Sequence, residues 1–114
     1  MSKITFFSTP EFEREFKRLK KKYRSLPDDL REFKNELLEN PHSGTDLGSN
    51  IRKVRVSIKS KGKGKSGGAR IITYDIVADI TNKAIILITI YDKSETEAIS
   101  INQIKNILNR NGFK

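Results

Sequence analysis

The sequence of 114 residues contains no cysteine and no tryptophan, and its single histidine is His42. Without cysteine, disulfide bonds and thiolate metal sites are excluded, and the reducing cytoplasm is the expected compartment. His42 follows Pro41 in a polar stretch, where a solvated loop residue is a far more common role than a metal ligand or a general base. We therefore expect no metal site and no cofactor.

Long apolar runs are also missing. The longest, Ala84–Ile90, is far shorter than the ~20 residues that a membrane-spanning helix needs, and it is predicted to be a buried strand. The length of the chain suits one domain, residues 1–114, with a modest core. We expect no membrane segment in it.

Acidic residues are absent from Leu47 to Tyr74, although the whole chain has 14 of them. With 23 lysines and arginines, the formal net charge is +9 and the pI is about 9.9. This balance indicates a polyanionic partner, either nucleic acid or an anionic membrane surface, and charge alone does not choose between them. The cationic residues of the acid-free stretch are Arg52, Lys53, Arg55, Lys59, Lys61, Lys63, Lys65 and Arg70.

The centre of this stretch, Lys53–Tyr74, is predicted to form two strands joined by a glycine-rich and lysine-rich loop. Alternation along the second strand, Ala69–Val77, places Arg70, Ile72 and Tyr74 on one face. The loop ends in Gly-Lys-Ser, but neither its glycine spacing nor the strand that follows fits a nucleotide-binding loop. The first strand has Val54, Val56 and Ile58 on one face and Lys53, Arg55 and Ser57 on the other, which is expected to stay out of the core.

A short strand, Lys3–Phe7, and two amphipathic helices precede this region. The first helix is predicted to begin near Pro10, with Thr9 as its cap, and the second to stop at Asn40. Their apolar stripes predict an αα-hairpin packed on a sheet, and residues 41–50 are predicted to be loop. The stripes are Phe12, Phe16, Leu19 and Tyr23 in the first helix, and Leu30, Phe33, Leu37 and Leu38 in the second.

The last third of the chain is predicted to add a strand and a helix. The strand, Ala84–Tyr91, is expected at the centre of the sheet because both of its faces are apolar. Ser94 and Glu97 have the spacing of a capping box and predict the start of the last helix. The resulting order is βααβββα, in the α+β class. The inward side of the last helix would consist of Ala98, Ile101, Ile104 and Leu108.

The available side chains limit the chemistry to what lysine, arginine and tyrosine can do. RNA carries its own nucleophile, the 2′-hydroxyl, whose attack on the adjacent phosphate needs a proton acceptor, cations and a proton donor. A lysine crowded by other cations can act as a base, while arginine stays charged and suits a phosphate clamp. Tyrosine can donate a proton or stack on a base. This set suits metal-free RNA cleavage and, equally, RNA binding alone.

The element order, the strand pair RKVRV and ARIITY, and the ending LITIYDKSETEAISINQIKNIL resemble the RelE/HigB superfamily of bacterial toxin–antitoxin toxins. The loop KGKGKSGGAR, together with LITIYDKSE, looks most like the HigB branch. The resemblance implies a mostly antiparallel four-stranded sheet with an αα-hairpin packed on it and a C-terminal helix. It also implies an mRNA interferase, which cuts mRNA in the ribosomal A site and is inhibited by a cognate antitoxin, expected to be of the helix-turn-helix type.

The resemblance also implies roles for individual residues. The two basic residues of the second strand in RelE-like toxins fall on Lys53 and Arg55, and the arginine that opens the third strand falls on Arg70. Ser94 and Ser100 stand where RelE has an arginine and a catalytic tyrosine, so the acid and base must be found elsewhere. The predicted catalytic set is Lys53, Arg55, Arg70, Tyr91 and Lys93, and the predicted RNA-contacting or ribosome-contacting set is Lys59, Lys61, Lys63, Lys65 and Tyr74.

Two other functions fit the same fold. One is a ParE-like toxin that acts on DNA gyrase, or another non-catalytic toxin, without nuclease chemistry, and the other is a plain RNA-binding domain, which would need no catalytic groups. The convergence of Lys53, Arg55 and Arg70 on one strand face favours RNA cleavage, because a gyrase poison would not need it.

Overall fold

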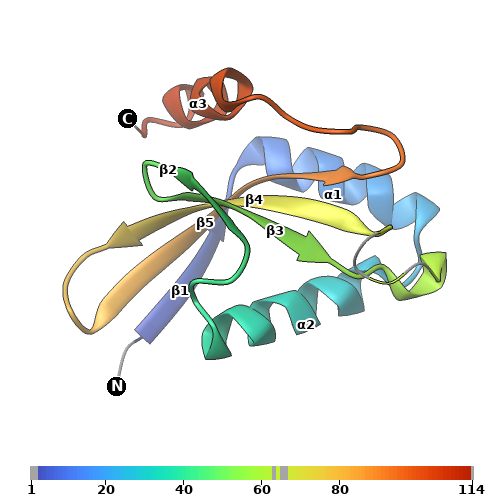
Figure 1. Cartoon of the computed structure of the whole chain (residues 1–114), viewed down its shortest axis with the longest axis horizontal. Coiled ribbons are helices and arrows are strands. Elements are labelled where there is room, and N and C mark those ends of the chain that lie inside the picture. Colours follow the sequence, from blue (N-terminus) through green and yellow to red (C-terminus); the bar gives the residue numbers. More distant parts are fainter. Residues whose placement is uncertain (1–2, 63, 65–66, 114) are drawn as a thin grey trace.

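The computed structural model describes residues 3–62, 64 and 67–113. Its sheet has five strands in the order β1-β5-β4-β3-β2, with β1 parallel to β5 and the other neighbours antiparallel (Figure 1). The predicted α+β class is confirmed, and the sheet gains a fifth strand. The elements in chain order are β1 (Lys3–Ser8), α1 (Pro10–Lys22), α2 (Leu26–Glu39), β2 (Thr45–Gly48), β3 (Ile51–Val56), the 3-10 helix η1 (Lys59–Lys61), β4 (Ala69–Val77), β5 (Asn82–Asp92) and α3 (Ile101–Arg110). No helix in the described ranges is long and apolar enough to cross a bilayer.

Thr9 fixes the start of α1, as predicted. Its hydroxyl accepts a hydrogen bond from the backbone N–H of Phe12 at 3.0 Å and donates one to the carbonyl of Ile88 at 2.6 Å. Pro10 occupies the first helical position, where a missing N–H costs nothing. The cap therefore starts the helix and also ties it to β5.

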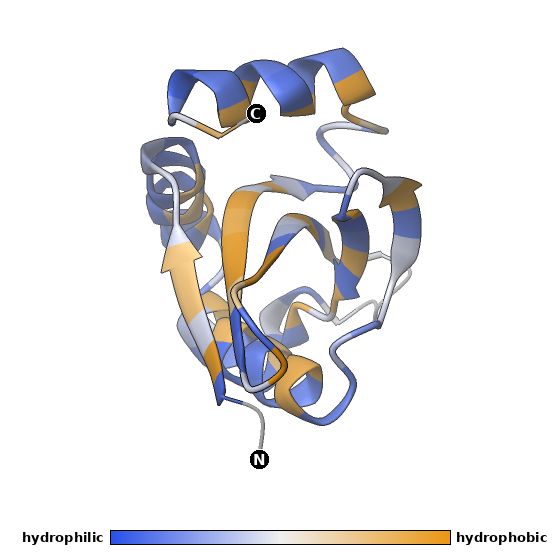
Figure 2. Ribbon diagram, turned by 90° about the vertical axis from the view of Figure 1, so that its left-hand side faces the viewer, coloured by the Kyte–Doolittle hydropathy of each residue, from blue (hydrophilic) through white to orange (hydrophobic). Residues whose placement is uncertain are grey.

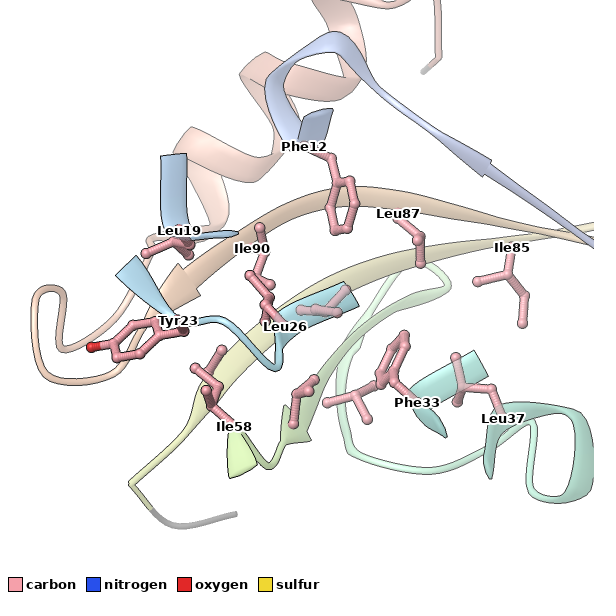
Figure 3. Packing of buried hydrophobic residues seen from close by; sticks show 14 residues of the cluster. Phe12, Leu19, Tyr23, Leu26, Phe33, Leu37, Ile58, Ile85, Leu87 and Ile90 are labelled. Atoms are coloured by element: carbon pink, nitrogen blue, oxygen red, sulfur yellow. The ribbon is translucent and has the colours of Figure 1, made fainter. Parts of the chain in front are cut away.

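The first core cluster lies between the sheet and the helices α1 and α2. Figure 3 shows Phe12 and Leu19 of α1, Phe33 and Leu37 of α2, and Leu87 of β5 converging there. The predicted stripe of α1 is confirmed. In α2 the prediction for Leu38 is wrong, because its side chain is 49% exposed and Leu26 is buried instead.

The second core cluster lies on the opposite face of the sheet, because Ile72 belongs to it and the adjacent Ile71 belongs to the first cluster. It joins Ile51, Ile72 and Ile88 of the sheet to Ile104 and Leu108 of α3. Figures 1 and 2 place α2 and α3 on opposite sides of the sheet. The strand β5, predicted to be central, lies between β1 and β4 and contributes to both clusters.

Two boundary predictions are wrong. Residues 41–50 are not loop throughout, because Thr45–Gly48 pairs with β3 as β2. The last helix begins at Ile101 instead of near Ser94, with a capping box formed by Ser100 and Gln103. The segment that was expected to open the helix forms a turn, in which the N–H groups of Glu95 and Thr96 donate to the carbonyl of Asp92.

Candidate functional site

Three predicted site residues are cross-strand neighbours. Arg55 of β3 pairs with Arg70 of β4, and Arg70 pairs with Tyr91 of β5. Directly opposed residues in antiparallel strands have Cα atoms about 4.5–5.5 Å apart and side chains on the same face. We call Arg55, Arg70 and Tyr91 the Arg–Tyr row. Three strands thus bring together residues that lie up to 36 positions apart in sequence, from 55 to 91.

Lys53 lies in the next row of the same face. It opposes Ile72, which opposes Thr89 in β5. Two positions before Lys53 in β3, Ile51 pairs with Tyr74. The face therefore changes from cationic to apolar along the strands. The prediction that this face stays out of the core is wrong, because Ile51 and Ile72 pack beneath α3.

Exposure differs sharply among Lys53 and the three residues of the Arg–Tyr row. Arg55 is exposed and Lys53 is half-buried, whereas Arg70 is 7% and Tyr91 5% exposed. One guanidinium nitrogen of Arg70 donates to the carbonyl of Ala69 at 3.1 Å. Within the described ranges neither Lys53 nor Arg55 forms an ion pair, so their charges are available to an anionic ligand.

Burial raises the pKa of the Tyr91 phenol above its ordinary value of 10.0, and the nearby positive charge of Arg70 opposes this rise only in part. Like an ordinary phenol, Tyr91 is therefore protonated at neutral pH, and the rise makes it a weaker acid. It can therefore donate a proton from the end of the row.

Lys93 and Tyr74, two other predicted site residues, have identifiable contacts. The ammonium of Lys93 donates to the carbonyl of Glu97 at 3.0 Å, and its backbone N–H donates to the carbonyl of Gly68. The ring of Tyr74 packs edge-on against Phe113, with centroids 5.7 Å apart. Lys93 follows the row at the end of β5, and Tyr74 lies on the same face under α3.

Two of the four predicted loop lysines, Lys59 and Lys61, form ion pairs within the protein. The ammonium of Lys59 pairs with Glu32 on α2. That of Lys61, whose side chain is 8% exposed, bonds to Asp92 at 2.6 Å and to the hydroxyl of Ser94 at 2.9 Å. These partners compete with any phosphate for both ammonium groups. Lys63 and Lys65 lie outside the described residues.

Asp92 is a structural residue of this region that the sequence did not single out. Its buried carboxylate accepts hydrogen bonds from the Tyr23 hydroxyl at 2.5 Å, from Lys61, and from the N–H and hydroxyl of Ser94 at 2.9 and 2.7 Å. Burial alone would raise its pKa, but these bonds outweigh burial and hold the pKa well below the ordinary 3.8. A carboxylate directly after the candidate Tyr91 was the available signal.

The two serines that replace expected catalytic residues both have structural roles. Ser94 binds Asp92, and the hydroxyl of Ser100 accepts the N–H of Gln103 at 3.1 Å at the start of α3. In the part of the chain that the structure describes, no three His, Cys, Asp or Glu side chains form a group that could hold a metal ion.

The fold and the site together define a small, basic α+β protein with an αα-hairpin on one face of its sheet and a row of two arginines and a tyrosine on the other. The family model of the RelE toxin of the RelE/RelB toxin–antitoxin system matches residues 5–110, nearly the whole chain. The chain therefore belongs to the RelE toxin family. Toxins of this family are typically ribonucleases, and membership implies a cognate antitoxin of the RelB type.

Proposed function

We propose that this RelE-family toxin is an mRNA interferase that cuts mRNA in the ribosomal A site and so stops translation. The observation that carries the proposal is the Arg–Tyr row with Lys53 beside it. Two arginines and a protonated tyrosine lie side by side on one sheet face, and such groups can stabilise the charge that develops on a phosphodiester and protonate its leaving oxygen.

In the proposed reaction the 2′-oxygen of one nucleotide forms a bond to the adjacent phosphorus, and the bond from phosphorus to the next 5′-oxygen breaks. The 2′-hydroxyl proton goes to a base on the protein, and the leaving 5′-oxygen receives a proton from an acid. The products are a 2′,3′-cyclic phosphate and a 5′-hydroxyl. No metal or cofactor takes part.

Each member of the site has a role in this scheme. Arg55 and Arg70 clamp the phosphate and stabilise the negative charge that develops on it. Tyr91, which is protonated at neutral pH, donates the proton to the leaving oxygen. Lys53 is the proposed base that accepts the 2′-hydroxyl proton. Lys93 is the second candidate for the proton donor.

The low exposure of Arg70 and Tyr91 is consistent with an activity that depends on the ribosome. A free RNA strand meets mainly Arg55 and Lys53, whereas Tyr91 packs against residues of α3. We propose that mRNA held in the A site, together with ribosomal RNA around the basic protein, brings substrate to the two less exposed groups.

We further propose the HigB branch for this toxin, on the resemblance of its loop sequence KGKGKSGGAR. Its antitoxin is proposed to be a helix-turn-helix protein that binds through apolar contacts supplemented by acidic residues, which suit a toxin with a net charge of +9. The proposed compartment is the cytoplasm, where ribosomes translate.

The test is primer extension on translated mRNA after induced expression. The wild type should produce cuts placed by codon, and Arg70→Ala or Arg55→Ala should lower cutting by roughly 10²–10³-fold, as expected when one donor to a transition-state charge is lost. Arg31→Ala is the matched control, because Arg31 is an exposed arginine of α2 paired only with Asp28 among the described residues.

Circular dichroism must show that each variant is folded. Growth arrest with intact mRNA and a DNA-damage response would overturn the proposal in favour of a ParE-like toxin. Arrest with intact mRNA and no DNA damage would favour RNA binding alone. Folded Arg55 and Arg70 variants that cut at the wild-type rate would show that the row is not the site.

A further inference from the structure

A cavity of about 210 Å³ opens between α3 and the turn that joins β2 to β3. We call it the Tyr74 pocket. The sequence analysis predicts RNA contact for Tyr74 alone, and it assigns no role to the other residues of the pocket. Its lining comes from that turn, two sheet strands and one side of α3, and consists of Ser49, Ile51, Tyr74, Lys105, Leu108 and Asn109.

The chemistry of the Tyr74 pocket suits a flat ring with polar edges. Ile51 and Leu108 are buried apolar residues, and they form an apolar floor. Tyr74 adds an aromatic ring, which the edge-on contact with Phe113 holds in place. Pockets that combine apolar walls, one fixed ring and a few polar groups are typical sites for nucleobases, which stack and hydrogen-bond along their edges.

The polar side chains at the rim of the pocket are available to hydrogen-bond a ligand. Among the described residues, neither the Asn109 amide, the Lys105 ammonium nor the Ser49 hydroxyl has a side-chain partner. Asn109 offers both a donor and an acceptor, which can read a base edge. Lys105 supplies a charge that suits the phosphate of the bound nucleotide.

The pocket lies on the same sheet face as the Arg–Tyr row. Ile51, in its floor, is two residues before Lys53 on β3, so the two side chains point the same way and are about 6.6 Å apart along the strand. Arg55 follows two residues later. This spacing is comparable to one step of an extended RNA strand, so a chain whose phosphate lies at Lys53 and Arg55 can place a neighbouring base in the pocket.

We infer that the Tyr74 pocket binds one unstacked nucleobase of the mRNA beside the cleaved linkage, with Asn109 reading its edge. This inference rests on the proposed function and adds to it a specificity-determining residue, Asn109, on α3.

The test compares the bases found at each codon position of the cut sites, mapped across the transcripts of cells that express each variant. The wild type should show a base preference at one position, and Asn109→Ala should weaken that preference by at least about fivefold, the lower end of what a paired side chain contributes to base discrimination. The Arg–Tyr row is unchanged in this variant, so the measured quantity is the base preference among the cuts that it still makes. Asn109→Asp keeps the shape and removes the donor, so it should change the preference at the same position.

Asn106→Ala is the matched control, because Asn106 is an exposed asparagine on the same helix and does not line the pocket. Its cut sites should match those of the wild type. The inference about the Tyr74 pocket would be overturned if the cut sites showed no base preference, or if both Asn109 variants kept the preference of the wild type. Either result would leave the nuclease proposal intact. If the wild type makes no cuts at all, the nuclease proposal fails and the pocket fails with it.

Discussion

One side chain, that of Asp92, joins three parts of the chain that are distant in sequence. Its carboxylate binds the hydroxyl of Tyr23 at the end of α1, the ammonium of Lys61 in η1, and Ser94 after β5. Removing one of these partners costs stability, because the buried carboxylate then lacks a hydrogen bond and no water replaces it. Asp92 directly follows Tyr91, so the same bonds hold the end of the Arg–Tyr row.

Tyr23→Phe should therefore lower the free energy of unfolding at pH 7 by about 1.5 kcal/mol, the lower end for a hydrogen bond to a charged group. Urea unfolding measures this change. Tyr74→Phe is the control, because the Tyr74 hydroxyl has no hydrogen-bond partner among the described residues. Equal effects of the two substitutions would contradict the assigned role of the Asp92 carboxylate.

The pH dependence of this effect has a definite sign. The folded pKa of Asp92 is depressed below the ordinary 3.8, so its contribution to stability is complete above that value and is lost as the pH falls from there through the folded pKa. The difference between the wild type and Tyr23→Phe should therefore shrink in acid. A difference that stays constant down to the acid limit of folding would contradict the ionised state of Asp92.

Residue contacts were only partly predictable from sequence. Alternation alone correctly placed Arg70, Ile72 and Tyr74 on one face, because side chains in a strand point to opposite faces in turn. The pairing of Arg70 with Tyr91 was not predictable, since it depends on the register between β4 and β5. That register also shifts after Ile72, which no local pattern reveals.

At the scale of elements, α3 depends on its cap. The hydroxyl of Ser100 accepts the N–H of Gln103, and the Gln103 side chain accepts the N–H of Ser100 at 2.9 Å. The helix has only 10 residues, and its stability comes largely from this cap and from the second core cluster. Both the cover over Tyr91 and the Tyr74 pocket depend on α3.

Ser100→Ala should loosen α3 without unfolding the sheet. The loss of a cap costs about 1 kcal/mol, so hydrogen exchange at the amides of Ile104, Ile107 and Leu108 should speed up by roughly fivefold. Asn106→Ala, in the middle of the same helix, should not speed up exchange, because alanine is the better helix former. Unchanged exchange in Ser100→Ala would show that packing alone holds the helix.

The predictions of element boundaries were wrong where the local sequence is compatible with two structures. Ser94 to Glu97 has the capping pattern of a helix start, but Asp92 engages the N–H and hydroxyl of Ser94 and closes a turn instead. The strand β2 was missed because it has four residues and a single large apolar side chain, Leu47. Its turn uses Ser49 and Asn50 in left-handed conformations, without the Asn-Gly pair that usually marks such a hairpin.

At the scale of the whole molecule, different helices pack on the two faces of the one sheet. The α1 and α2 face is a hydrophobic core, while the other face is apolar under α3 and cationic beyond it. The fold and the family were predictable because apolar periodicity, caps and the basic strand pair all agree with one architecture. The chemistry was less predictable, because it depends on which side chains end up adjacent and exposed.

The most direct test of the central claim uses purified protein with ribosomes that hold a defined codon in the A site. We predict one cut within that codon, leaving a 5′-hydroxyl and a 2′,3′-cyclic phosphate. The same mRNA with a single 2′-deoxynucleotide at the cut position should remain intact, because the attacking hydroxyl is missing. An mRNA that is never cut, or that is cut equally well with the 2′-deoxynucleotide in place, would contradict the account.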